Sequence, residues 1–306
     1  MAYNIDDKLV VAIASSALFN LTESDKVFKE QGLEAYETFQ KKNIDKPLEQ
    51  GIAFPFIKRL LSLNHINKEI QPIEVILLSR NSINTGLRVF RSISEYGLEI
   101  TRAAFFSGAS PYKYIPAFKA SIFLSGNEQN VKDAILEGYS AGQVLGVPSK
   151  DEDFSEEFRI AFDFDGVIAN DESEIIFKKK GIKSYHEYEK KFGNKPLELG
   201  PAGDLIKKIS AIQKLEQGLI KNNKDYKPII RTSIVTARNA PAHERVITTL
   251  NYHGITVDEA FFLGGIEKKQ VLEIMKPHIF FDDQKTHLEE LENVPVVHIP
   301  FGIANK

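Results

Sequence analysis

The sequence contains no cysteine among its 306 residues. This absence excludes a disulfide scaffold, a cysteine-ligated zinc site and a thiol nucleophile, and it fits a reducing compartment. Long apolar runs are missing too, because the segment that most resembles a targeting signal, residues 9–19, is too short to span a bilayer. It also lacks the positive lead-in of a secretory signal, since Asp6 and Asp7 precede it. We therefore expect a cytoplasmic protein without a membrane span.

A strong charge of one sign is also absent. The chain has 39 Lys and Arg residues against 42 Asp and Glu residues, a formal net charge of −3. Nonspecific binding to a phosphate backbone requires a basic field, so we exclude a protein that coats nucleic-acid polymers. Apolar residues make up 42% of the chain, which is ordinary for a globular protein with a full core. The length allows one large domain or two ordinary ones.

The chain contains an internal repeat. Residues 36–51 read YETFQKKNIDKPLEQG, and residues 185–200 read YHEYEKKFGNKPLELG. Shared helical periodicity does not reproduce Lys-Pro-Leu-Glu at one fixed offset beside a matching Lys-Lys, so a duplication is the better explanation. We predict two homologous halves, residues 1–150 and 151–306, joined near the acidic linker at residues 149–153.

Strands alternate with helices in each half. A short apolar run comes first, a long helical insertion follows, and three further strands alternate with helices, with a last strand at 294–300 in the second half only. This order predicts parallel sheets with helices on both faces, that is, two tandem Rossmann-like α/β halves. The insertions occupy about 20–72 and 168–230. In such folds chemistry gathers at the carboxyl ends of the strands.

The first strand of the second half ends in two carboxylates. Asp163 and Asp165 follow an apolar run and precede Gly166. Because residues two apart in an extended strand point the same way, both carboxylates can converge on one phosphate or metal. Gly166 permits a sharp turn after them. A solvated turn is the plain alternative, but such a turn does not require the apolar and aromatic run that leads into these acids.

Two further strand ends offer groups that bind phosphate. Thr236 can present its hydroxyl beside the N–H groups of the following helix, and Arg238 at the same strand end is a candidate substrate contact. After the next strand, Lys268 or Lys269 opens a helix, where a lysine can neutralise a nucleophile and its phosphate. Each motif is weak alone, since a threonine at a strand end and a solvated lysine are both common.

A second pair of acids, Asp282 and Asp283, ends another apolar strand. Adjacent residues alternate sides, so we expect one to ligate a metal and the other to orient a partner. Hard oxygen ligands without cysteine favour Mg²⁺ over zinc. Taken together, the order Asp-x-Asp, Thr, Lys, Asp-Asp is a specific signal.

This order and spacing resemble the haloacid-dehalogenase-like phosphohydrolases. The segments VAIASSALF, AFPFIKRLL, TRAAFFSG, VTARNAPAHERVI and KPHIFFDDQ are, in addition, similar to the cytosolic 5′-nucleotidase type I family, over nearly the whole chain. The resemblance implies Mg²⁺-dependent hydrolysis of nucleoside 5′-monophosphates, typically AMP or deoxynucleotides. It also implies a haloacid-dehalogenase-like fold in each half, with the two insertions as helical caps.

The resemblance gives each motif a role. Asp163 is the nucleophile that takes up the phosphoryl group, and Asp165 is the acid/base that protonates the leaving ribose oxygen and then activates water. Thr236 and Lys268 bind the phosphoryl oxygens. The implied ligands of Mg²⁺ are Asp163, the main-chain carbonyl of Asp165, and Asp283, with Asp282 beside it.

The first half has lost all of these acids. At the matching positions it has Ala14, Ser16, Leu78 and the pair Ser125 and Gly126, so we expect it to be catalytically inactive. Two interpretations of this half stay open. Either it buries an apolar face of the other half, or its strand ends bind a nucleoside or a regulatory nucleotide. In the second interpretation, Arg80 contacts phosphate, Asn81 makes a polar contact and Tyr112 stacks on a base.

The core motifs leave other functions open. A phosphatase of sugar phosphates or other small phosphomonoesters would use the same residues, since the nucleotide assignment rests on the family resemblance. A regulatory nucleotide-binding protein with little turnover belongs to a different class. The intact acids Asp163, Asp165 and Asp283 argue against that class, because a binding module needs no aspartyl nucleophile. Base preference, effector and oligomeric state stay open.

Overall fold

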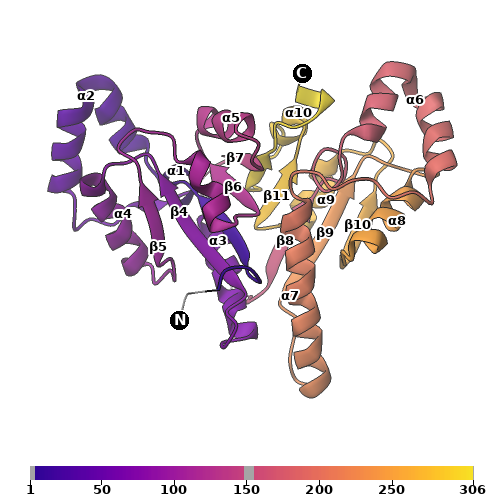
Figure 1. Ribbon diagram of the computed structural model, residues 1–306, viewed down its shortest axis with the longest axis horizontal. Coiled ribbons are helices and arrows are strands. Elements are labelled where there is room, and N and C mark those ends of the chain that lie inside the picture. The colour runs from indigo at the N-terminus through magenta and orange to yellow at the C-terminus, as the bar shows by residue number, and fades with distance from the viewer. Residues whose placement is uncertain (1–3, 148–154, 306) are drawn as a thin grey trace. The chain divides into compact units, whose positions relative to one another are not determined.

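The computed structural model describes residues 4–147 and 155–305, and Figure 1 shows the course of the chain. The chain divides into two compact units, unit 1 at residues 1–153 and unit 2 at residues 154–306. The predicted linker at 149–153 lies outside the described residues. No helix in the described ranges is long and apolar enough to cross a membrane.

Unit 1 is built on parallel strands in the order β7-β6-β1-β4-β5. Its long strands β1 and β4 are buried along their whole length, as expected for strands covered on both faces. The sheet strands are β1 (Leu9–Ile13), β4 (Ile73–Ser79), β5 (Arg102–Phe105), β6 (Ile122–Ser125) and β7 (Ala141–Leu145). The helices are α1 (Ser15–Leu18), α2 (Thr22–Lys42), α3 (Phe54–Ser62), α4 (Ile83–Glu95) and α5 (Glu128–Leu136), with short 3-10 helices η1 (Leu63–Ile66) and η2 (Tyr112–Phe118). A small antiparallel pair joins β2 (Phe19–Asn20) to β3 (Glu49–Gln50).

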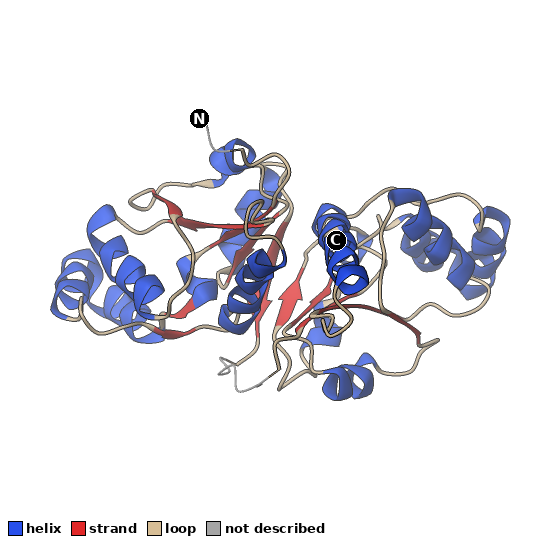
Figure 2. Ribbon diagram, turned by 90° about the horizontal axis from the view of Figure 1, so that it is seen from below, coloured by secondary structure: helices blue, strands red, loops and turns tan. Residues whose placement is uncertain are grey.

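Unit 2 repeats this arrangement with the strand order β12-β11-β8-β9-β10, again parallel throughout. Its strands are β8 (Phe158–Phe162), β9 (Ile230–Thr236), β10 (Glu259–Phe262), β11 (Ile279–Asp282) and β12 (Val296–His298). Its helices are α6 (Glu172–Phe192), α7 (Gly203–Asn222), α8 (His243–His253), α9 (Lys268–Met275) and α10 (Lys285–Leu288), with the 3-10 helix η3 (Ile303–Asn305). Helices flank the strands within each unit (Figure 2). The predicted α/β fold with parallel strands is confirmed.

The two units share more than strand order. In unit 1 the backbone N–H of Leu48 donates to Ser92 Oγ at 2.9 Å, and in unit 2 the N–H of Leu197 donates to Thr249 Oγ1 at 3.1 Å. These four residues stand at matching places in the repeat, and the contacts support the predicted duplication, which stays a prediction. Strand β7 was not expected from the sequence, because its short run AGQVL is neither long nor strongly apolar.

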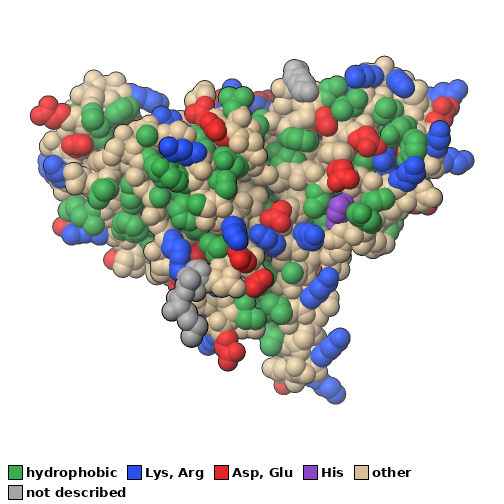
Figure 3. Space-filling model, viewed as in Figure 1, with side chains coloured by type: hydrophobic (Ala, Val, Ile, Leu, Met, Phe, Trp, Pro, Cys, Tyr) green, Lys and Arg blue, Asp and Glu red, His purple; other side chains and the backbone are tan. Residues whose placement is uncertain are grey.

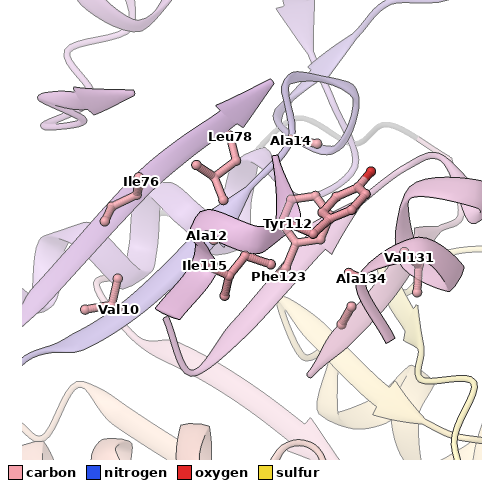
Figure 4. Close-up of a cluster of buried hydrophobic side chains, with 11 residues drawn as sticks. Val10, Ala12, Ala14, Ile76, Leu78, Tyr112, Ile115, Phe123, Val131 and Ala134 are labelled. Atoms are coloured by element: carbon pink, nitrogen blue, oxygen red, sulfur yellow. The ribbon is translucent and has the colours of Figure 1, made fainter. Parts of the chain in front are cut away.

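The interior of unit 1 is a cluster of aliphatic and aromatic side chains on and around its sheet (Figure 4). Tyr112 lies in this cluster, with none of its surface exposed and its ring 5.5 Å from that of Phe123. Burial raises the pKa of the Tyr112 hydroxyl to about 12. This ring belongs to the core of unit 1.

The interior of unit 2 fixes the strands that precede the acidic motifs. The rings of Phe162 and Phe281 stack with centroids 5.1 Å apart, and the backbone N–H of Asp163 donates to Phe281 O at 2.7 Å. Each ring immediately precedes an acid in the sequence, so tight packing of the rings fixes where the acids start.

Each predicted insertion contains a kinked helix between the first two main strands of its unit. Helix α2 bends at Gly32 and helix α6 bends at Gly181, where φ is +82° and +76° respectively. The lysines at 178–180 are exposed on α6. Lys and Arg side chains gather on the surface over α6 and α7 (Figure 3), as a solvated helical face requires.

Candidate active site

The motifs singled out in the second half meet at the carboxyl end of the sheet of unit 2. Asp163 directly follows β8, Thr236 is the last residue of β9, and Asp282 is the last residue of β11. Lys268 is the first residue of α9, after β10. Carboxyl ends of neighbouring parallel strands share one edge, which brings together residues more than one hundred positions apart.

Asp163 is a buried carboxylate with a charged partner. Only 5% of the residue is exposed, and its Oδ2 lies 2.8 Å from Lys268 Nζ. Its Oδ1 accepts the backbone N–H of Phe164 at 2.7 Å. Burial raises the pKa of Asp163 to about 6, although the charge of Lys268 acts in the opposite direction. The carboxylate is therefore held in one orientation and is poorly solvated.

Lys268, and not Lys269, reaches the acids. Its ammonium group lies between two carboxylates, 2.8 Å from Asp163 Oδ2 and 2.7 Å from Asp282 Oδ2. Burial alone would lower the pKa of Lys268, but these two carboxylates outweigh it and raise the pKa, so the side chain is a permanent cation. Lys269 is partly exposed and pairs weakly with Glu273 at 4.0 Å. The geometry thus favours the register that was chosen from the sequence.

The neighbouring acids Asp282 and Asp283 have different environments. Asp282 bonds to Lys268 and also accepts the N–H of Gln284 at 2.8 Å. Asp283 is completely buried, and neither of its carboxylate oxygens has a hydrogen-bond partner among the described residues. Burial, with Asp163 and Asp282 nearby, raises the pKa of Asp283 to about 9. A buried carboxylate without a partner is what a cation site provides.

A second group of potential ligands lies beside this one. Oxygens of Asp163 and Asp282 and a ring nitrogen of His287 come within 4.8 Å of one another. However, both oxygens of Asp282 already have protein partners, and His287 Nδ1 itself lies 3.2 Å from Asp282 Oδ2. The unpartnered oxygens of Asp283 therefore fit a metal better than this group does, and oxygen ligands suit a hard divalent cation.

Asp165 is held by an arginine. Arg238 donates from Nε to Asp165 Oδ2 and from Nη2 to Asp165 Oδ1, each at 2.7 Å. Only 4% of Arg238 is exposed, and its remaining nitrogen, Nη1, donates to Glu189 and to the carbonyl of Ala242. Arg238 was predicted as a substrate contact, but every nitrogen of its guanidinium has a protein partner. This placement favours a role in holding Asp165.

Thr236 lies beside this pair. The residue is buried, and its Oγ1 accepts the backbone N–H of Arg238 at 3.3 Å. In this contact the Thr236 oxygen is the acceptor, so its hydroxyl hydrogen can still be donated to another group. Contact between Thr236 and a phosphoryl oxygen stays a prediction.

Gly166 closes the turn after Asp165 and can be tested directly. Its φ is +70°, and a Cβ there would overlap the carboxylate of Asp283. We expect Gly166→Ala to lower the free energy of unfolding by more than about 1 kcal/mol and to displace Asp283, weakening divalent-cation binding. Titration calorimetry and thermal melts measure both effects.

Gly181→Ala is the matched control, since its φ of +76° is equally unfavourable for alanine but nothing lies within 4 Å of its Cβ position. It should lose stability and keep cation affinity. Equal cation affinities for the two alanine variants would contradict the assigned role of Gly166.

The strand ends of unit 1 differ from those of unit 2. Arg80 is exposed and donates from Nε and Nη2 to the carbonyl of Gly108, at 3.0 and 2.8 Å. Asn81 is half-buried beside it, and its backbone N–H donates to Ser79 Oγ. The buried ring of Tyr112 has no face open to a base, so the structure does not support stacking there. Phosphate contact by Arg80 stays a prediction.

Reasoning from the sequence missed the ionic partners of the site. Glu189 and Arg245 are almost completely buried, on α6 and α8, and each belongs to a network that reaches Arg238. A signal was present in the repeat, because Glu189 matches Gln40 where the two copies otherwise agree closely. An acid gained only in the copy that keeps the catalytic acids points to that site.

The whole chain, residues 1–306, matches the model of a family described as 5′-nucleotidase. The chain therefore belongs to the 5′-nucleotidase family, and the resemblance found in the sequence is confirmed. It is 34% identical over 288 residues to human (Homo sapiens) cytosolic 5′-nucleotidase 1B, an alignment that covers 92% of this chain and 47% of the relative. The chain thus spans about half the length of this curated relative.

Proposed function

We propose that this chain is a Mg²⁺-dependent 5′-nucleotidase that hydrolyses nucleoside 5′-monophosphates, such as AMP or deoxynucleotides, to nucleoside and phosphate. The observation that carries the proposal is the pairing of Asp163 with Lys268 beside the unpartnered, buried carboxylate of Asp283, in a member of the 5′-nucleotidase family. Phosphoryl transfer needs a nucleophile, a positive charge near the phosphate and ligands for a metal ion. Asp163, Lys268 and the carboxylate oxygens of Asp283 can supply them.

The first half of the reaction transfers the phosphoryl group. Asp163 attacks phosphorus, and the bond between phosphorus and the ribose O5′ breaks as the aspartyl phosphate forms. Asp165 gives its proton to the leaving O5′, so that the nucleoside departs as an alcohol. Lys268 and Thr236 contact the phosphoryl oxygens, and the ammonium group of Lys268 offsets the charge that develops on them.

The second half of the reaction releases phosphate. Asp165, now a carboxylate, takes a proton from a water molecule while the water oxygen attacks phosphorus. The bond between phosphorus and the carboxylate oxygen breaks, and Asp163 is free again. The bidentate contact with Arg238 fixes the orientation of the Asp165 carboxyl group.

The acids can hold a divalent cation. Asp163, the main-chain carbonyl of Asp165 and Asp283 are the ligands we propose, with Asp282 holding Lys268 in place. When bound, Mg²⁺ supplies positive charge that polarises the phosphoryl group. Its binding also satisfies the oxygens of Asp283, which otherwise are buried without a partner.

We also propose a role for the insertion in each unit. We infer that residues 168–230 form a cap that closes over the ribose and excludes water. The equivalent insertion at 20–72 belongs to a unit that we propose to be inactive, because the strand ends of unit 1 carry alanine, serine or glycine where unit 2 has acids. The duplication of the two units is part of the same proposal.

The sequence and the comparison also bear on the cellular location and on the size of the substrate. We propose a cytoplasmic location, which fits the description of the human relative as a cytosolic enzyme. The substrate is a small nucleotide, and the net charge of −3 gives no field for a nucleic-acid polymer.

The decisive experiment measures phosphate release from a panel of nucleoside 5′-monophosphates and sugar phosphates, with Mg²⁺ and with a chelator. We expect Mg²⁺-dependent release from AMP or a deoxynucleotide, with sugar phosphates at least about tenfold slower in kcat/KM. Activity confined to sugar phosphates would retain the catalytic residues and overturn the substrate. Nucleotide binding with no release from any compound would make the chain a regulatory binding protein.

A further inference from the structure

Glu189 is a completely buried acid that the proposed chemistry does not use. It lies near the end of α6, in the insertion, and none of its surface is exposed. An isolated buried carboxylate is very unfavourable, so its partners decide whether it is tolerated. Ser173 Oγ donates to its Oε1 at 2.8 Å, and Arg245 Nη1 donates to the same oxygen at 3.1 Å. Its other oxygen, Oε2, accepts from Arg238.

These contacts form a chain from the insertion to the acid/base residue. Glu189 on α6 bonds to Arg238, and the two other nitrogens of Arg238 bond to Asp165. The guanidinium also lies over the ring of Phe164, 5.0 Å from its centroid. A guanidinium held by a carboxylate on one side presents its opposite edge in a fixed direction. We call Glu189, Arg238 and Asp165 the acid-holding network.

Unit 1 contains the matching positions without the acids. Gln40 stands for Glu189 and accepts from Arg88 Nη1 at 3.2 Å, just as Glu189 accepts from Arg245. Ser16 stands for Asp165. Asn81 stands for Arg238, because the backbone N–H of Asn81 donates to Ser79 Oγ just as that of Arg238 donates to Thr236 Oγ1. The contact between helices survives in unit 1 with a neutral glutamine, so docking of the insertion helix does not require a charge at this position.

The position of Arg238 holds a different residue in the two units. In unit 1, which has Ser16 and Gln40 in place of the two acids, this position holds the neutral, half-buried Asn81. With both acids present, Arg238 is buried between them. The negative charge of Glu189 therefore accompanies a buried arginine at this position, whereas docking of the helix does not depend on that charge.

We propose that Glu189 is a positioning residue for catalysis, which acts through Arg238 to hold the carboxyl group of Asp165 toward the leaving oxygen. The inference rests on the proposed function, in which Asp165 donates that proton. It places a determinant of proton transfer on the insertion helix α6, so that the orientation of the acid is complete only while α6 is docked. A misplacement of about 1 Å at a reacting group can lower a rate about 100-fold.

The test compares two substrates that differ at one atom. In the first, AMP, the leaving ribose oxygen needs a proton. In the second, sulfur replaces that bridging oxygen, and the thiolate leaves without one. The parameter kcat/KM covers the steps up to departure of the nucleoside, so it isolates the proton donation by Asp165 from the later hydrolysis.

Glu189→Gln is the variant to measure, because Gln40 shows that the amide supports the same helix contact. We expect kcat/KM for AMP to fall at least about tenfold and kcat/KM for the sulfur analogue to stay within about threefold. The thermal midpoint should change by less than about 4 °C. Arg238→Lys, which keeps the charge but loses the bidentate contact, is expected to show the same selective loss and serves if Glu189→Gln does not fold.

Arg245→Lys is the matched control. Arg245 is buried against the same glutamate, and also contacts Glu172, but it does not bond to Asp165. We expect it to lower the thermal midpoint while the ratio of the two kcat/KM values stays that of the wild type. Equal losses on both substrates in Glu189→Gln, or no loss on either, would overturn the positioning role. A wild-type chain that hydrolyses neither substrate would instead contradict the proposed function.

Discussion

Asp163→Asn is expected to lower phosphate release from AMP at least about 10⁴-fold, because an amide cannot attack phosphorus and no other side chain can replace the nucleophile. The fold should survive. Lys268 keeps its 2.7 Å contact with Asp282, and asparagine retains a carbonyl oxygen for the N–H of Phe164. Phosphate release and a thermal melt on the same preparation separate loss of chemistry from loss of structure.

The sign of the stability change follows from the pKa of Asp163. Its value rises from 3.8 to about 6 on folding, mainly because of burial. The folded chain thus binds the proton more tightly than the unfolded chain, and this group makes the protein less stable as pH rises from about 4 to 6, with the penalty persisting above that range. Asparagine has no charge to bury, so at pH 7 the thermal midpoint should be unchanged or higher.

Asp204→Asn provides the control for Asp163→Asn. It makes the same chemical change on α7, where the side chain is 53% exposed and pairs with Lys208 on the next turn. It should keep full activity. A folded Asp163→Asn variant with more than about 1% of wild-type turnover would rule out the covalent route through this residue.

The parts of the molecule that depend on local sequence could be predicted. The apolar runs of β8 and β11 predict that these strands are buried. The acids at positions 163, 165, 282 and 283 lie at the ends of these runs. Because parallel strands end at the same edge of a sheet, the acids are expected to meet there. Lys268 was assigned through the family resemblance, and in the structure its ammonium group contacts both Asp163 and Asp282.

The parts that depend on tertiary contacts could not be predicted. Arg238 was predicted as a substrate contact, but one of its nitrogens donates to a glutamate 49 positions earlier in the sequence. Tyr112 looked available for stacking, yet a 3-10 helix turns its ring into the core of unit 1. Hydrophobic periodicity predicts neither the contact of Arg238 with Glu189 nor the burial of Tyr112, because both depend on how the elements pack together.

Asp283→Asn should remove the response to Mg²⁺ and lower phosphate release at least about 100-fold. Loss of an anionic ligand weakens the cation, and the cation supplies several kcal/mol of stabilisation to the transferring phosphoryl group. In the presence of a chelator, the same substitution is expected to raise the stability of the protein. Folding without metal forces Asp283, which has no partner among the described residues, to take up a proton at pH 8, and asparagine removes that cost. The metal-free variant should therefore melt at a higher temperature than the metal-free wild type at pH 8.

The pH dependence of these melts identifies Asp283 as the ligand. Its pKa rises from 3.8 to about 9 on folding, so the folded, metal-free chain holds a proton that the unfolded chain has lost. This group therefore makes the metal-free wild type less stable as pH rises from about 4 to 9. Mg²⁺ takes the place of that proton, so it should raise the wild-type midpoint more at pH 8 than at pH 6 and leave Asp283→Asn almost unchanged. An equal Mg²⁺ shift in wild type and variant would mean that the cation binds elsewhere, with the group formed by Asp163, Asp282 and His287 as the site to test next.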